Sequence, residues 1–222
     1  MTKAVHLLMD ESGSMVSMKD QAISGYNDYL KTLEGSGVVL ALTKFDTTKY
    51  EFVHDMLPIE DAVRLDNENY RPGAGTPLYD AMAHVIKKTE HQARELEKSS
   101  GERSDVLIVV MTDGEENSSH EYDMDNLNAL IKEHEDAWGW NFVYLGSSPD
   151  AWKNEAAYHG TQVSSVQSSG GRGLRAAYSA TADSTAEWAS KPLGAKLDIT
   201  DDQKRWVKEQ SEDADGSLSS SS

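Results

Sequence analysis

The chain has 222 residues, with 38 acidic and 21 basic side chains, a formal net charge of -17 and no cysteine. This length suits one full domain with an appendage. The lack of cysteine excludes a disulfide scaffold, an iron–sulfur cluster, a thiolate zinc site and a cysteine nucleophile. The acidic excess argues against nucleic-acid or membrane-surface partners, which need clustered Lys and Arg. With no apolar run of membrane-spanning length and no apolar leader, we expect a soluble, cytoplasmic protein.

Apolar runs and helical patterns alternate along the first half of the chain. The run 4–9 predicts a first strand. A helix follows to about residue 34, because apolar side chains recur there at helical spacing. Segments 38–45 and 49–57 predict two further strands that pair as a hairpin. The polar stretch 58–75 has no regular pattern.

The second half continues this alternation. An amphipathic helix over about 78–98 precedes the apolar run 106–111, which is typical of a strand buried on both faces of a parallel sheet. The remaining expected elements are a helix over 124–138, a strand over 141–145, a helix over 150–158, a short strand over 161–164 and a helix over 174–188. This order predicts a doubly wound, three-layer α/β sandwich with a mostly parallel sheet.

The composition changes after residue 190, which predicts three parts. Residues 1–190 form the main domain, 191–210 a C-terminal extension with a short helix, and 211–222 a disordered tail of acidic and serine residues. Trp206 is the one large apolar residue of the predicted extension helix. It packs either on a partner or, as we favour, on its own domain.

Oxygen-bearing side chains gather where the predicted strands end. The first strand runs into Asp10, Ser12 and Ser14, and the strand 106–111 runs into Asp113. Between them, Thr76 lies immediately before a helix. In doubly wound sheets, ligands bind outside the carboxyl ends of the strands. These three segments therefore deliver carboxylates and hydroxyls to one edge of the sheet.

The donor set suits a hard divalent cation. Mg²⁺ takes six oxygen ligands at about 2.0–2.1 Å and needs only one or two carboxylates. Asp10, Ser12 and Ser14 alternate, so their side chains can project the same way, and Thr76 and Asp113 add a hydroxyl and a carboxylate. We therefore predict that these five residues bind Mg²⁺ or Mn²⁺, with one coordination position facing solvent.

The Asp-x-Ser-x-Ser motif at residues 10–14, with Thr76 and Asp113-Gly114, resembles the von Willebrand factor A (VWA) domain over about residues 1–190. All five positions match the metal-ion-dependent adhesion site of that family, in the form of its microbial, intracellular members. The resemblance implies a mostly parallel sheet with one antiparallel edge strand. It also implies hydroxyl ligands at Ser12, Ser14 and Thr76, with Asp10 and Asp113 binding directly or through water. A partner's Glu or Asp commonly completes the coordination.

Simpler interpretations exist for several of these residues. Asp10, Ser12 and Ser14 include good helix caps, although capping explains only one of them. We expect three rim glutamates to be solvated charges rather than ligands: Glu11, Glu115 and Glu116. Asp46 and Asp80 are either support for the ligands or, more simply, a turn residue and a helix N-terminal charge. We expect none of the seven histidines to be catalytic.

Two functions fit this site. The first is a protein-binding module that captures a Glu or Asp carboxylate of a partner through the bound cation. The second is a metal-dependent phosphoesterase, since a dication polarises phosphate. We expect the first, with no catalytic residue, because no nucleophile or general base is evident. The sequence does not indicate the oligomeric state or the partner's identity.

Overall fold

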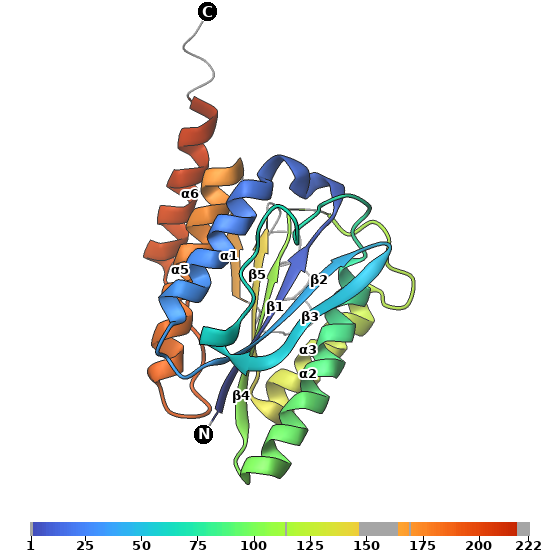
Figure 1. Ribbon diagram of the computed structural model, residues 1–222, viewed down its shortest axis with the longest axis vertical. Helices are drawn as coiled ribbons and strands as arrows, with labels where there is room; N and C mark the ends of the chain where they lie inside the picture. The colour runs from blue at the N-terminus through green and yellow to red at the C-terminus, as the bar shows by residue number, and fades with distance from the viewer. Residues whose placement is uncertain (1, 114, 147–163, 169, 217–222) are drawn as a thin grey trace, which may run out of the picture.

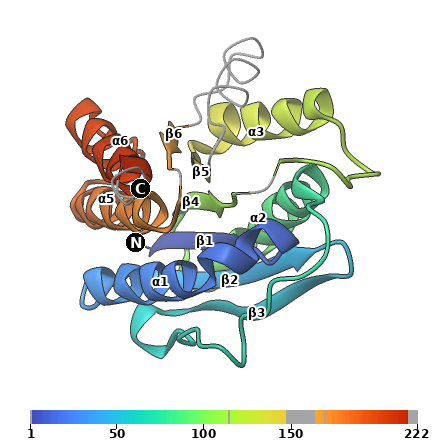
Figure 2. The ribbon, with the colours of Figure 1, turned by 90° about the horizontal axis from the view of Figure 1, so that it is seen from above.

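The computed structural model describes residues 2–113, 115–146, 164–168 and 170–216. They form a six-stranded sheet between two layers of helices (Figures 1 and 2). The strand order is β3-β2-β1-β4-β5-β6, and all neighbours are parallel except the antiparallel edge strand β3. The strands are β1 (Thr2–Asp10), β2 (Val39–Asp46), β3 (Lys49–Pro58), β4 (Ser104–Met111), β5 (Asn141–Gly146) and β6 (Ser164–Gln167). The predicted fold class is confirmed.

Helices cover both faces of the sheet. Helices α1, α5 and α6 lie on one side and α2 and α3 on the other (Figure 2). The helical elements of the described residues are η1 (Gly13–Met18), α1 (Lys19–Leu33), η2 (Ile59–Asp61), α2 (Leu78–Ser100), α3 (Met124–Trp138), α5 (Gly170–Ser190) and α6 (Asp201–Gly216). The described helices include none with the length and apolar character of a membrane-spanning segment.

Strand β1 lies at the centre of the sheet and contributes side chains to the hydrophobic cores on both of its faces. Val5, Leu7 and Met9 belong to the core that contains α1 and α5, whereas Ala4 and Leu8 belong to the core that contains α2 and α3. All five side chains are buried. The sequence of β1 therefore shows no alternation of apolar and polar residues, because neither face of the strand meets water.

His6 is a buried polar residue in the middle of β1. Its ring nitrogens lie 2.7 Å from Thr89 Oγ1 and 2.8 Å from Thr43 Oγ1. Burial, assisted by the positive charge of Lys88, lowers the pKa of His6 to about 3. The ring is therefore neutral at physiological pH and links β1 to β2 and α2.

The predicted elements up to residue 146 are all present, with shifted boundaries. The segment after β1 first forms the 3-10 helix η1, and the predicted first α-helix begins only at Lys19. The predicted helix 150–158 lies outside the described residues. A strand is present at Ser164–Gln167, which shares only residue 164 with the predicted strand 161–164; residues 161–163 lie outside the described residues. The predicted helix 174–188 is part of the longer α5.

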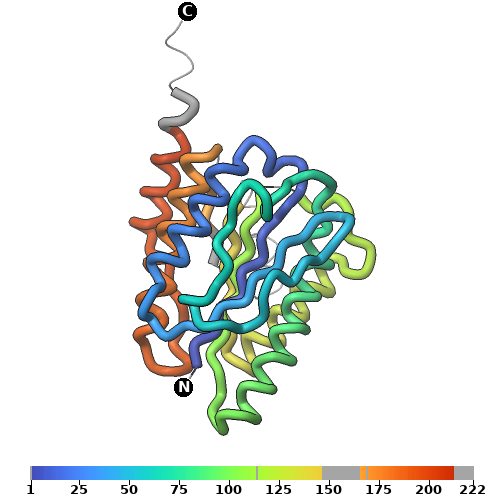
Figure 3. The backbone as a smooth tube through the Cα atoms, viewed as in Figure 1, coloured from blue at the N-terminus to red at the C-terminus, as the bar shows by residue number. Residues whose placement is uncertain are grey.

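Helix α6 folds back along α5 (Figure 3). Val207 is fully buried, and a Cβ added at Gly173 would lie 2.1 Å from Ser211 Oγ, so the two helices approach closely there. Trp206 is 42% exposed and lies on the rim of a groove. The helix ends at Gly216, so the prediction that order ends at residue 210 is wrong for 211–216. The division into domains stays a prediction.

The amino end of the sheet has its own buried ion pair. Lys3 Nζ lies 2.7 Å from Asp105 Oδ2 at the start of β4 and 4.4 Å from the centre of the Trp188 ring. Asp105 also accepts a hydrogen bond of 2.9 Å from the Gly194 amide. Asn141 Oδ1 accepts another, of 2.9 Å, from the Leu197 amide. These contacts hold the segment between α5 and α6 against the amino end of the sheet.

Candidate functional site

The carboxyl ends of β1 and β4 meet where the strand order reverses. β1 pairs with β2 on one side and β4 on the other, and the site is at the end of the β1–β4 pair. Asp10, the last residue of β1, is fully buried. Its Oδ2 accepts a hydrogen bond of 2.5 Å from Thr112 Oγ1, and its Oδ1 accepts one of 2.6 Å from the Ser12 amide. The carboxylate is thus held at the switch point that doubly wound folds use for ligands.

Ser12 and Ser14 direct their hydroxyls toward each other. Their Oγ atoms lie 3.0 Å apart. Gly13 between them donates its amide to the Ala74 carbonyl at 2.8 Å, which joins this loop to the segment before Thr76. Two neighbouring oxygens of an octahedral Mg²⁺ site, each at about 2.1 Å from the ion, are about 3.0 Å apart. The two hydroxyls are hydrogen-bonded to each other, and this separation is also that of adjacent ligands.

Thr76 is buried and fixed through its backbone. Its amide donates to Asn117 Oδ1 at 3.0 Å, and its carbonyl accepts from the Asn117 amide at 3.2 Å. Gly75 donates its amide to Thr47 Oγ1 at 3.2 Å. A Cβ at Gly75 would lie 2.7 Å from Ser118 Oγ, so any larger residue would require the neighbouring side chains to shift. Sequence reasoning missed Asn117, because nothing in its local pattern indicates a partner so far away in the chain.

Asp113 lies two residues after the end of β4 and is partly exposed. Burial raises the pKa of Tyr144, and the negative charges of Asp10 and Asp113 raise it further. Both carboxylates are therefore near enough to the Tyr144 hydroxyl in β5 to raise its pKa. The structure thus brings Asp10, Ser12 and Ser14 into one bonded cluster and ties the Thr76 loop to it, while Asp113 stands at the neighbouring strand end.

The donor chemistry of these residues fits a hard cation. Two carboxylates balance a dication, and the paired hydroxyls supply neutral oxygens. Within the described ranges, no group of three or more His, Cys, Asp or Glu side chains is placed to hold a metal. The predicted site does not need such a group, because it contains only two carboxylates.

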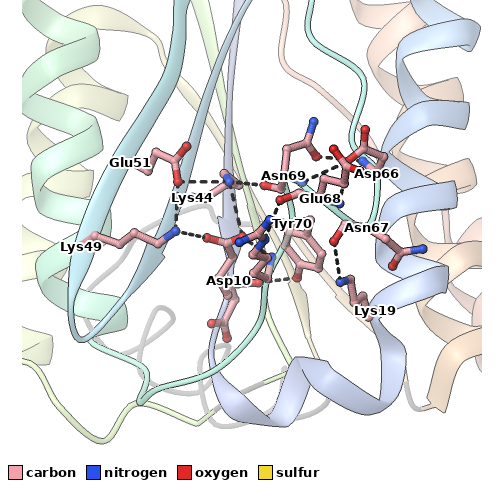
Figure 4. Close-up of polar contacts among 12 residues, drawn as sticks. Asp10, Lys19, Lys44, Lys49, Glu51, Asp66, Asn67, Glu68, Asn69 and Tyr70 are labelled. Atoms are coloured by element: carbon pink, nitrogen blue, oxygen red, sulfur yellow. Dashed lines mark hydrogen bonds and ion pairs between the residues drawn. The ribbon is translucent and has the colours of Figure 1, made fainter.

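The expectation that Glu11 is a solvated rim charge is wrong. Its side chain is fully buried and points away from the predicted ligands into an ion cluster, which we define as Glu11, Lys44, Lys49 and Glu51. Lys49 Nζ lies 2.9 Å from Glu11 Oε2, and Lys44 Nζ lies 3.4 Å from Glu11 Oε1. Both lysines also contact Glu51, at 3.0 and 3.1 Å (Figure 4). The four charges sum to zero.

Three other acidic residues organise loops around the site. Asp80 is buried and accepts hydrogen bonds from the amides of residues 120–122, at 2.8 to 3.1 Å. Glu116 accepts from the Tyr79 amide at 3.0 Å, near the start of α2. Asp46 accepts from the Thr48 amide at 2.6 Å, so it is the turn residue of the simpler interpretation. Asp80 and Glu116 together hold the loop that carries Asn117.

Comparison with known proteins identifies the fold. No protein-family model matches the sequence, and no curated protein matches it. Among solved structures, the chain is similar to the PilB minor pilin from Streptococcus sanguinis (TM-score 0.61, 12% identity, covering 86% of this chain and 64% of that chain). It is also similar to the vWF domain of the type V pili tip protein Mfa5 from Porphyromonas gingivalis (TM-score 0.56, 12% identity, covering 90% and 98%).

A third similar structure is the manganese-loaded TRAP protein of Plasmodium vivax, with a TM-score of 0.52 and 15% identity over 75% of this chain and 68% of that chain. At these identities the likeness shows the fold alone. The chain therefore has a VWA-like fold, and it spans less than two thirds of the PilB chain.

Proposed function

We propose that this VWA-like domain is a protein-binding module that captures a Glu or Asp carboxylate of a partner through a bound Mg²⁺ or Mn²⁺. Asp10, Ser12, Ser14, Thr76 and Asp113 would hold the cation. When bound, the ion supplies a positive centre that accepts the partner's carboxylate oxygen. The observation that carries the proposal is the 3.0 Å separation of the Ser12 and Ser14 hydroxyls beside the buried Asp10 carboxylate.

The charge of the chain supports a cation at this contact. A chain with a formal charge of -17 repels an acidic ligand. A dication held by only two carboxylates offsets that repulsion locally and still attracts an anion. The contact area must come from the surrounding rim, since one ionic contact gives little affinity. Val16, two residues after Ser14, is 59% exposed and offers an apolar contact there.

The carboxylates near the site support binding rather than catalysis. Glu11 is the acidic residue closest in sequence to the two ligand serines, but it is fully buried and paired with two lysines. It cannot reach a substrate as a general base. Asp10 is likewise enclosed and holds the Ser12 amide. We therefore propose a module without enzymatic activity and keep its cytoplasmic location as a prediction.

Manganese titration followed by electron paramagnetic resonance tests the proposal. We expect one site in the unaltered chain and at least about a tenfold weaker affinity in Thr76→Ala and Asp113→Ala, with unchanged circular dichroism. Unchanged affinity in both variants would falsify the ligand assignment. Metal-dependent turnover of a phosphoester, abolished by Asp10→Ala, would instead establish the phosphoesterase.

The partner is sought by affinity purification in Mg²⁺ and in chelator, followed by mass spectrometry. A protein retained only in Mg²⁺ should lose binding when its contacting Glu or Asp is changed to Gln or Asn. Retention that survives both chelator and that substitution would contradict carboxylate capture.

A further inference from the structure

Glu11 lies between two predicted ligands, Asp10 and Ser12, yet its side chain serves another loop. Glu11 Oε1 accepts a hydrogen bond of 2.8 Å from the Arg71 amide, and the Glu11 carbonyl accepts one of 2.8 Å from the Gly73 amide. One residue of the Asp10–Ser14 loop is therefore bonded twice to the segment that leads to Thr76.

Neighbouring residues strengthen the same connection. Tyr70 donates its hydroxyl to the Asp10 carbonyl at 2.5 Å, and Lys44 of the ion cluster donates to the Asn69 carbonyl (Figure 4). Gly13 donates its amide to the Ala74 carbonyl at 2.8 Å. The whole stretch from residue 69 to 74 is thus fixed against the loop that carries three predicted ligands.

Stability alone does not account for a buried charge at this position. Burying a carboxylate and an ammonium costs solvation that their attraction only partly returns, and an apolar pair is often as stable. The ion cluster does something an apolar pair cannot, because the Arg71 amide needs an oxygen acceptor and the Lys44 ammonium beside Asn69 needs a negative partner. Because the four charges of the ion cluster cancel, the net negative charge at the proposed metal site comes from Asp10 and Asp113.

We propose that Glu11 is a positioning residue of the metal site. Through the ion cluster and the Arg71 and Gly73 amides, it sets the place of the Thr76 loop relative to Asp10, Ser12 and Ser14. This inference rests on the proposed function, because it assigns Glu11 a role in metal affinity and not only in folding.

The Lys3–Asp105 pair provides a matched control. Asp105 is also a buried carboxylate that pairs with a lysine and accepts a backbone amide, but at the opposite end of the sheet. Glu11→Ala and Asp105→Ala therefore each remove a buried carboxylate that pairs with lysine and accepts a backbone amide. Glu11→Gln keeps an oxygen that can accept the Arg71 amide and removes only the charge.

The test measures Mn²⁺ affinity and amide hydrogen exchange on the full chain. We expect Glu11→Ala to weaken Mn²⁺ binding about 10- to 100-fold and to speed exchange at the Gly13, Arg71 and Gly73 amides. Glu11→Gln should recover most of the affinity. Asp105→Ala should lower the melting temperature comparably, with Mn²⁺ affinity and these three amides unchanged.

Equal losses of affinity in Glu11→Ala and Asp105→Ala would overturn the inference, because they would show a general loss of stability. Unchanged affinity in Glu11→Ala would overturn it as well. If Glu11→Ala does not fold, Glu11→Gln decides: protected amides with near-normal Mn²⁺ affinity are expected, and a loss of affinity with the three amides still protected would overturn the inference. If the unaltered chain does not bind Mn²⁺, the proposed function and the metal role of Glu11 are both wrong. The hydrogen-exchange data would then show separately whether Glu11 positions the loop before Thr76.

Discussion

The two ends of the sheet bury the same kind of ion pair for different purposes. At the carboxyl end, Glu11 pairs with lysines and accepts the Arg71 amide. At the amino end, Asp105 pairs with Lys3 and accepts the Gly194 amide. At the carboxyl end, the loop that carries Glu11 also carries the paired Ser12 and Ser14 hydroxyls and the buried Asp10 carboxylate. The comparison shows that a buried ion pair fixes loops at either end of the sheet, and that the two sets of loops carry different side chains.

The largest expected effect is a loss of stability that the two ends share. Removing one partner of a buried pair leaves the other charge uncompensated, at a cost of about 3–5 kcal/mol. We therefore expect Glu11→Ala and Asp105→Ala each to lower the free energy of unfolding by about that amount in urea denaturation. A cost below about 1 kcal/mol in one of them would show that the two pairs are not equivalent.

His6 lies in β1 between the two ends of the sheet, and it makes the free energy of unfolding depend on pH. Its pKa falls from 6.5 to about 3 on folding, so below pH 6.5 the unfolded chain binds the proton more readily than the folded chain. Stability present above pH 6.5 is therefore lost as the pH falls toward 3, by up to about 1.4 kcal/mol per unit. Urea midpoints measured from pH 7 to 4 should show this slope.

Replacing the histidine isolates this contribution. His6→Gln should lower stability at pH 7 and flatten the slope, whereas the exposed His120→Gln should leave both unchanged. An equally steep slope in His6→Gln would assign the acid sensitivity to other groups, such as the carboxylates at the two ends.

A smaller expected effect concerns two asparagines, one at each end of the sheet, whose side chains each accept a backbone amide. Asn117 accepts the Thr76 amide at the carboxyl end, and Asn141 accepts the Leu197 amide at the amino end. Loss of either acceptor leaves a backbone N–H unpaired, at a cost of about 1–3 kcal/mol. We expect Asn117→Ala and Asn141→Ala to lower stability similarly, and only Asn117→Ala to weaken Mn²⁺ binding. Weaker binding in Asn141→Ala would contradict this separation.

The smallest expected effect concerns Lys49. Its side chain is 39% exposed, and Lys44 remains beside Glu11 when Lys49 is replaced. Exposed ion pairs contribute about 0–1 kcal/mol. Lys49→Met should therefore lower the free energy of unfolding by less than about 1 kcal/mol, while Lys44→Met should cost several times more. Equal costs in urea denaturation would show that both lysines hold Glu11 to the same degree.

The sequence was sufficient to predict the fold and the placement of Asp10 at the carboxyl end of β1. Apolar runs identified the strands, and the alternation with helices placed the ends of β1 and β4 at one edge. The spacing of Asp10, Ser12 and Ser14 indicated side chains on one side of a loop, and the 3.0 Å between the two hydroxyls agrees with that expectation.

The support around the site could not be predicted in the same way. The sequence predicts a solvated Glu11, but its side chain contacts Lys44 of β2 and Lys49 of β3. Asn117 meets Thr76 across a long stretch of chain, and no local pattern encodes that pairing. The extent of α6 was missed because a few contacts, such as Val207, order a helix whose composition is otherwise polar.

The central claim is tested most directly by Mn²⁺ titration of the unaltered chain and of the double variant Ser12→Ala, Ser14→Ala. Two hydroxyls at ligand separation predict one site in the unaltered chain and a loss of at least about tenfold in affinity in the double variant, with the fold retained. Equal affinity in the two proteins, or no binding by the unaltered chain, would contradict the account.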